Sequence, residues 1–216
     1  MSFQYVYCGG WSNFRGEVAG FKGEVKGLHV LKWNRNAGVL EDNGLFEEQI
    51  LGQSILAVAG DTLISVCELG KGGKVVSYRI HSDGSLERKD ILEFTSAKLS
   101  YCVTDPRGKY VFVSSMGDGT VKMIRIGDDG KLALTDEYQL TGHSVTPRQA
   151  QAKVHSVMIS PDGSLLGAAN LAPTSWNCSG WTTKGRFFAL CAQSLWTGGR
   201  SPGTWHFIPV ESTYIC

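Results

Sequence analysis

Three hairpin-like turns recur at a constant interval, and this spacing constrains the fold more than any other feature of the chain. The turns read NAGVL at 36–40, SDGSL at 82–86 and DDGKL at 128–132, and their glycines are 46 positions apart in both intervals. Each turn follows an apolar run with the alternation of a β-strand. Glycine permits the positive φ that tight hairpin turns need, so the pattern predicts repeated β-hairpins.

A second turn marks the same repeat in the following part of the chain. DPRGK at 105–109 recurs as SPDGS at 160–164, nine residues later than a strict interval of 46 would give, and the extra length falls in QLTGHSVTPRQAQAK. A repeat in the mid-forties built from about four short strands is typical of a β-propeller blade. We therefore predict an all-β fold, a partial β-propeller over residues 1–171 with three blades and part of a fourth.

The regular pattern stops after Leu171. The segment 172–216 holds four of the six tryptophans, three of the six cysteines and three of the six prolines, and it shows no alternation of apolar and polar residues. The sequence predicts an irregular C-terminal tail here. Two explanations remain: a divergent cap, or a tail that is read out of frame.

The genetic code allows the second explanation to be examined. In the shifted frame, each new codon consists of the last base of one residue's codon and the first two bases of the next. Tryptophan has a single codon, so Trp176-Asn177 must give Glu, Trp181-Thr182 must give Asp and Trp205-His206 must give Ala. Around these forced residues, the shifted frame permits a strand with a DDKG turn and, further on, an HPGG turn between two strands. Both turns fall close to the spacing of the earlier repeats. We therefore hypothesise a one-base slip near Leu171.

Charge and cysteine spacing exclude several classes of partner. The formal net charge is +1, from 21 basic and 20 acidic residues, so no basic surface indicates nucleic acid or an anionic membrane. The N-terminal MSFQYVYCGG does not resemble a secretory leader, and no long apolar run predicts a membrane span, so we expect a cytoplasmic protein. No CxxC or CxxH spacing is present; we therefore expect neither a metal site nor a cofactor.

Two stretches carry a resemblance to a known family. DPRGKYVFVSSMGDGTVKMIRIGDDGKL and RQAQAKVHSVMISPDGSLL resemble the lactonase family of seven-bladed β-propellers, which includes 6-phosphogluconolactonases and carboxymuconate-lactonizing enzymes. The resemblance implies that three to four blades of an expected seven are present. It further implies a hydrolase that converts 6-phospho-D-glucono-1,5-lactone to 6-phosphogluconate in the pentose phosphate pathway.

The family motif transfers to particular residues of this chain. Arg148 and Gln149 correspond to an Arg-Gln pair, and His155 with Ser156 to a terminal His-Ser, whereas Lys153 stands where the family has another histidine. Opening a lactone requires a base for the attacking water, and a phosphorylated substrate requires cations. The resemblance thus implies His155 as the catalytic base, and Arg148, Gln149 and Lys153 as residues that bind a sugar lactone.

Each of these residues also has a structural explanation. His155 could be a strand-end histidine hydrogen-bonded to a neighbouring blade, and Arg148 and Lys153 could be solvated cations. His143 and Ser144 are adjacent in sequence, which is the wrong arrangement for a base and its nucleophile.

Three functional hypotheses therefore remain for the chain. It belongs to a sugar-lactone hydrolase, to an enzyme of the carboxymuconate-lactonizing type, or to a non-catalytic propeller scaffold. With so few blades the ring cannot close, and open blade edges favour aggregation. We expect little activity from the 216-residue chain itself, and the sequence leaves its oligomeric state open.

Overall fold

A computed structural model describes most of the chain up to Leu171. The described residues are 3–10, 27–46, 50–68, 72–95, 98–143 and 150–171, followed by the backbone of four further strands. Among these residues there is no helix that is both long enough and apolar enough to span a bilayer. The described strands form antiparallel sheets, and the chain divides into two compact units, which are described separately below.

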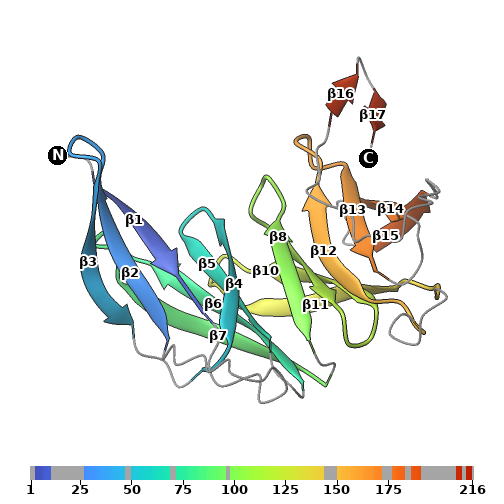
Figure 1. Ribbon diagram of the computed structural model, residues 1–216, viewed down its shortest axis with the longest axis horizontal. Coiled ribbons are helices and arrows are strands. Elements are labelled where there is room, and N and C mark those ends of the chain that lie inside the picture. Colours follow the sequence, from blue (N-terminus) through green and yellow to red (C-terminus); the bar gives the residue numbers. More distant parts are fainter. Residues whose placement is uncertain are drawn as a thin grey trace. The chain divides into compact units, whose positions relative to one another are not determined.

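The first unit comprises Met1–Leu99 together with Gly127–Leu132 and contains two sheets. Figure 1 shows their strands side by side in blue and green. A three-stranded sheet has the order β1-β2-β3 and a four-stranded sheet the order β4-β5-β6-β7. The strands are β1 (Phe3–Cys8), β2 (Leu28–Asn34), β3 (Val39–Phe46), β4 (Gln53–Ala59), β5 (Thr62–Glu68), β6 (Gly73–Ile80) and β7 (Leu86–Phe94).

The second unit comprises Ser100–Ile126 and Ala133–Cys216. It contains the strands of two four-stranded sheets, β11-β10-β9-β8 and β12-β13-β14-β15, and of a two-stranded sheet, β16-β17. The strands are β8 (Leu99–Thr104), β9 (Tyr110–Ser115), β10 (Thr120–Ile126), β11 (Leu132–Gln139), β12 (Val154–Ile159), β13 (Leu165–Asn170), β14 (Asn177–Thr182), β15 (Arg186–Leu190), β16 (Ile208–Val210) and β17 (Thr213–Ile215).

The four larger sheets confirm the predicted all-β repeat. The three turns 46 residues apart connect β2 to β3, β6 to β7 and β10 to β11. Their glycines, Gly38, Gly84 and Gly130, have φ values of 66°, 82° and 84°, the left-handed conformation that glycine adopts without strain. The local signal of a glycine between two alternating runs was therefore sufficient to locate these hairpins.

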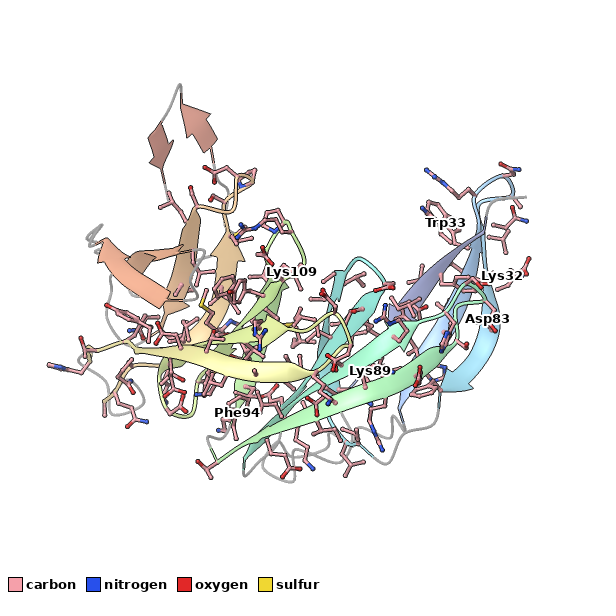
Figure 2. The ribbon with its side chains drawn as sticks, turned by 180° about the vertical axis from the view of Figure 1, so that it is seen from behind. Lys32, Trp33, Asp83, Lys89, Phe94 and Lys109 are labelled. Atoms are coloured by element: carbon pink, nitrogen blue, oxygen red, sulfur yellow. The ribbon has the colours of Figure 1, made fainter. Side chains whose placement is uncertain are left out.

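The turn at 105–109 is closed by a buried carboxylate. Asp105 Oδ1 accepts hydrogen bonds of 2.7 Å from the backbone N–H groups of both Lys109 and Tyr110. Lys109, labelled in Figure 2, lies where this turn enters β9. In the equivalent turn of the next sheet, Ser160 Oγ accepts a 2.9 Å hydrogen bond from the N–H of Leu165. A side-chain oxygen therefore replaces a missing backbone partner in both turns.

Each unit has an apolar cluster among its described residues. All seven residues of the central strand β5 are buried, so both of its faces are covered. In the first unit the buried members are Leu28, Ile50, Leu63, Cys67, Val76, Tyr78 and Leu86. In the second unit they are Phe112, Val121, Met123, Leu140, Ala152, Val154, Val157, Leu166 and Ala168.

Strands also occur in the segment for which the sequence predicted irregular structure. β14 pairs with β13 from Leu165↔Gly180 to Ala168↔Asn177, and β15 pairs with β14, which completes a four-stranded sheet. The backbone groups along the outer edge of β13 need hydrogen-bond partners, and an extended chain can supply them without any alternation of side chains. The sequence analysis therefore missed these two strands, because their residues show no alternation of apolar and polar side chains.

Candidate functional site

His155 lies at a β-bulge in β12. Val154 pairs with Asn170 and Ser156 pairs with Ala169, so His155 is the extra residue of this strand. The bulge shifts the alternation: Val154 and Val157 are buried, three positions apart instead of two, whereas His155 is exposed. Bulges commonly redirect a side chain beside a functional site. The exposed imidazole is thus carried by a strand segment in which Val154 and Val157 are packed in the core.

Lys153 precedes this bulge and is half-buried. Its backbone N–H donates a 2.9 Å hydrogen bond to Asn170 Oδ1, and its carbonyl accepts a 2.9 Å hydrogen bond from the N–H of Leu171. Asn170 is itself buried, and its Nδ2 donates to the carbonyl of Thr141 at 3.2 Å. Asn170 therefore fixes the entry of the chain into β12.

The sequence analysis did not single out Asn170 as a site residue. Its only signal is a polar amide at the end of the apolar run LLGAAN. That signal is weak, because the partners of this amide lie 17 and 29 residues away.

The turn between β9 and β10 contacts the same segment. Gln151 Nε2 donates a 3.2 Å hydrogen bond to the carbonyl of Gly117. Gly119 has a φ of 72°, and a Cβ at this position would lie 2.6 Å from the carbonyl oxygen of Ala152. Only glycine permits this close approach of two backbones. The turn at 116–119 and residues 151–152 are therefore in direct contact.

A buried lysine on β10 pairs with a carboxylate of this turn and with a carboxylate of β11. Lys122 Nζ is within 3.3 Å of Asp118 Oδ2, 2.5 Å of Glu137 Oε2 and 2.8 Å of Thr120 Oγ1, and the side chain is only 1% exposed. A buried ammonium needs such partners, since an unpaired charge in the interior is strongly unfavourable. The sequence analysis missed this cluster because nothing in the run VKMIRI distinguishes a buried lysine from a solvated one.

Two of the predicted site residues lie outside the part of the chain that the structure describes. Arg148 and Gln149 lie outside the described residues, as does Ser144. His143 is described and exposed. Within the described ranges, no group of three or more His, Cys, Asp or Glu side chains could hold a metal ion. The structure thus places Lys153 directly before β12 and His155 within it, and their roles stay predictions.

The described part of the site offers a base and a cation. A neutral imidazole exposed to solvent can accept a proton from water, and an ammonium can attract an anionic group of a ligand. The backbone beneath both is rigid, because Val154 is fully buried and Asn170 is hydrogen-bonded to the neighbouring loop. This arrangement is suited to general-base chemistry on a small polar molecule.

Comparison with known proteins gives one family. The family model described as "Lactonase, 7-bladed beta-propeller" matches residues 6–172, which is most of the chain and ends close to Leu171, where the repeat stops. A 6-phosphogluconolactonase of Formosa agariphila is 28% identical over 148 residues, which cover 65% of this chain and 41% of that protein.

Solved structures show the same fold. A candidate 6-phosphogluconolactonase from Bacteroides uniformis has a TM-score of 0.78 at 18% identity, and the match covers 92% of this chain and 56% of that one. The periplasmic gluconolactonase PpgL of Pseudomonas aeruginosa has a TM-score of 0.70 at 24% identity, covering 83% and 50%. The chain spans about half the length of these structures and less than half that of the curated relatives it matches.

Proposed function

Because this chain belongs to the lactonase family of seven-bladed β-propellers, we propose that it serves the hydrolysis of a lactone ring. The observation that carries the proposal is the family match over residues 6–172, which includes the β12 bulge and its exposed histidine. Fold alone does not fix function, so the chemistry must come from the side chains at this bulge.

The substrate we propose is 6-phospho-D-glucono-1,5-lactone. A relative named 6-phosphogluconolactonase supports this choice, and so does the cation at Lys153. With Arg148, which can bind a phosphate through two parallel hydrogen bonds, Lys153 would hold the phosphoryl group of the substrate. A lactone without phosphate would lose both interactions.

The proposed reaction needs one proton acceptor. His155 takes a proton from water as the water oxygen attacks the lactone carbonyl, and the ring C–O bond then breaks. The same proton returns to the departing ring oxygen, which gives an open-chain hydroxy acid. Gln149 would donate a hydrogen bond to the carbonyl oxygen as negative charge develops there.

We further propose that the frame change near Leu171 separates this chain from a longer lactonase. The described residues hold four blade-like sheets and the family has seven blades, so the 216-residue chain would supply only part of a site. We call the protein read one base over after Leu171 the frame-restored protein. We expect it to hydrolyse the lactone and the 216-residue chain to do so poorly.

Two measurements test these proposals. Sequencing of the transcript across the Leu171 codon shows whether the second frame is used. Hydrolysis of 6-phospho-D-glucono-1,5-lactone above the spontaneous rate is then measured for both proteins, with glucono-1,5-lactone and a muconolactone as competing substrates. His29→Gln is the control for His155→Gln, since His29 is also an exposed strand histidine beside a bulge.

The expected result is turnover of the phosphorylated lactone by the frame-restored protein, lost in His155→Gln and kept in His29→Gln. Preference for the muconolactone would favour the carboxymuconate-lactonizing type and contradict the substrate. No hydrolysis of any lactone would leave a binding scaffold and contradict the function.

A further inference from the structure

Two buried serines contact the backbone of β12 beside the bulge. Ser100, on β8, donates a 2.9 Å hydrogen bond from Oγ to the carbonyl of Val154. Ser114, on β9, donates a 3.3 Å hydrogen bond from Oγ to the carbonyl of His155. The two hydroxyl oxygens are 3.1 Å apart. Adjacent carbonyls of β12 are therefore held by adjacent serines of the preceding sheet.

Both serines are buried: Ser100 is 9% exposed and Ser114 is fully buried. Each hydroxyl has a single proton. A backbone carbonyl of β12 lies within hydrogen-bond distance of each hydroxyl, and the two hydroxyls also lie within hydrogen-bond distance of one another. A bulge interrupts the ladder of the sheet, so the carbonyls beside it depend on partners from outside that ladder. Removal of either hydroxyl would take this hydrogen bond away from a carbonyl of β12.

A second bulge shows that these serines are not needed to form one. In β4, Gln53 pairs with Cys67 and Ile55 pairs with Val66, so Ser54 is the extra residue in the same register as His155. There the carbonyl of Gln53 faces Gly9, because a Cβ on Gly9 would lie 1.9 Å from it. The bulge is thus a feature of the repeat, whereas the serine pair belongs to the copy that carries the histidine.

We propose that Ser100 and Ser114 are positioning residues for His155: they fix the peptide groups on both sides of its Cα and thereby set the direction of the imidazole. The proposal rests on the proposed function for its kinetic consequence only. The alternative is that the serines stabilise the packing of the two sheets without any effect on the imidazole.

The experiment compares side chains of equal shape at position 114. Ser114→Thr keeps a hydroxyl and Ser114→Val does not, while both add the same volume. NMR signals of the His155 imidazole are recorded in the 216-residue chain and assigned by their loss in His155→Gln. Ser77→Ala is the control, because Ser77 Oγ donates a comparable buried hydrogen bond of 2.6 Å to the carbonyl of Gly130 in the first unit.

We expect Ser114→Val to shift the His155 signals and Ser114→Thr to keep them close to those of the parent chain. Ser77→Ala should lower stability and leave those signals unchanged. If Ser114→Val does not fold, Ser100→Ala and Ser114→Ala answer the same question. Unchanged His155 signals in the variants without the hydroxyl would overturn the proposal.

Kinetics give a second readout in the frame-restored protein. A base displaced from the attacking water should lower kcat about 10- to 100-fold with little change in KM. If the imidazole moves in Ser114→Val but no protein hydrolyses a lactone, positioning stands and the proposed function fails. If the lactone is hydrolysed equally well by Ser114→Val and Ser114→Thr, positioning fails and the function stands.

Discussion

The strands β4 and β12 share a backbone irregularity and differ in what it presents. Both carry one extra residue at the same register, Ser54 in β4 and His155 in β12. Ser54 Oγ is buried and has no hydrogen-bond partner among the described residues, whereas His155 is exposed. The repeat thus supplies the geometry more than once, and one copy carries a group capable of proton transfer. In a propeller, chemistry can therefore arise by substitution at a position that the fold already provides.

The largest expected difference between the two bulges is catalytic. In the frame-restored protein, His155→Ala should lower kcat/KM for the phosphorylated lactone by about 10²- to 10⁴-fold, the usual cost of losing a general base. Ser54→Ala should leave kcat/KM nearly unchanged, since it removes a buried hydroxyl and no proton acceptor. Steady-state kinetics measure kcat/KM for both variants. An equal loss of kcat/KM in His155→Ala and Ser54→Ala would mean that the bulge of β12 has no catalytic role.

Close backbone approach is the feature that the two bulged strands share. Ala at Gly119 would meet the carbonyl of Ala152 at 2.6 Å in a left-handed conformation, and Ala at Gly9 would meet the carbonyl of Gln53 at 1.9 Å. We expect each substitution to lower the free energy of unfolding by about 3 kcal/mol. Gly38 has a φ similar to that of Gly119, but a Cβ there would meet open space. Gly38→Ala should therefore lower the free energy of unfolding by only about 1 kcal/mol.

Urea unfolding of the three glycine variants measures these losses. The comparison would be broken if Gly38→Ala cost as much as the other two, because steric contact with the bulged strands would then explain nothing.

The two bulges also differ in the residue that lies across the sheet. Cys67 lies opposite Gln53, and burial raises the pKa of its thiol from 9.0 to about 12. The thiol therefore stays protonated in the folded protein while the unfolded chain ionises. This contribution to stability is complete below pH 9 and is lost as the pH rises toward 12, by about 1.4 kcal/mol for each pH unit.

Unfolding free energies measured between pH 8 and pH 11 test this loss (roughly the range in which an ordinary thiol ionises). Cys67→Ala should show a smaller decline than the parent chain. Part of the decline will remain, because burial also raises the pKa of the Cys102 thiol to about 12. Identical slopes in the two proteins would show that the sheet of β4 opens to solvent.

The smallest effect is expected at the entry to β8, which lies between the two bulged strands in sequence. Lys98 has a φ of 65°, a conformation that costs a non-glycine residue about 1 kcal/mol. Lys98→Gly should therefore raise the free energy of unfolding by about 0.5 kcal/mol, after the added chain entropy of glycine is subtracted. Lys98→Ala keeps the strain and serves as the control. Thermal unfolding that ranks the two variants equally would exclude strain at this residue.

The sequence predicted those parts of the fold that depend on local signals. The hairpins around Gly38, Gly84 and Gly130 follow from a turn residue between alternating runs, and the spacing of 46 made them a repeat. Contacts between sheets carry no such signal. The bonds from Ser100 and Ser114 to β12 join residues 54 and 41 positions apart, so a reading along the chain could not find them.

The bulge itself left a trace that the sequence analysis did not use. Val154 and Val157 are three positions apart, and a regular strand would bury residues two positions apart. The burial of Lys122 left no trace in the sequence, because every residue of β10 except Arg125 is buried, whether it is polar or apolar. The strands β14 and β15 depend on the edge of β13, which supplies hydrogen bonds regardless of side-chain pattern.

The most direct test of the account is an NMR titration of the 216-residue chain with 6-phospho-D-gluconate, the product of the proposed reaction. The imidazole signals of His155 are followed together with those of His29, the exposed histidine beside the bulge of β2. The account predicts saturable shifts at His155 and none at His29. Equal or absent shifts at the two histidines would contradict the claim that the bulge of β12 presents His155 to a sugar lactone.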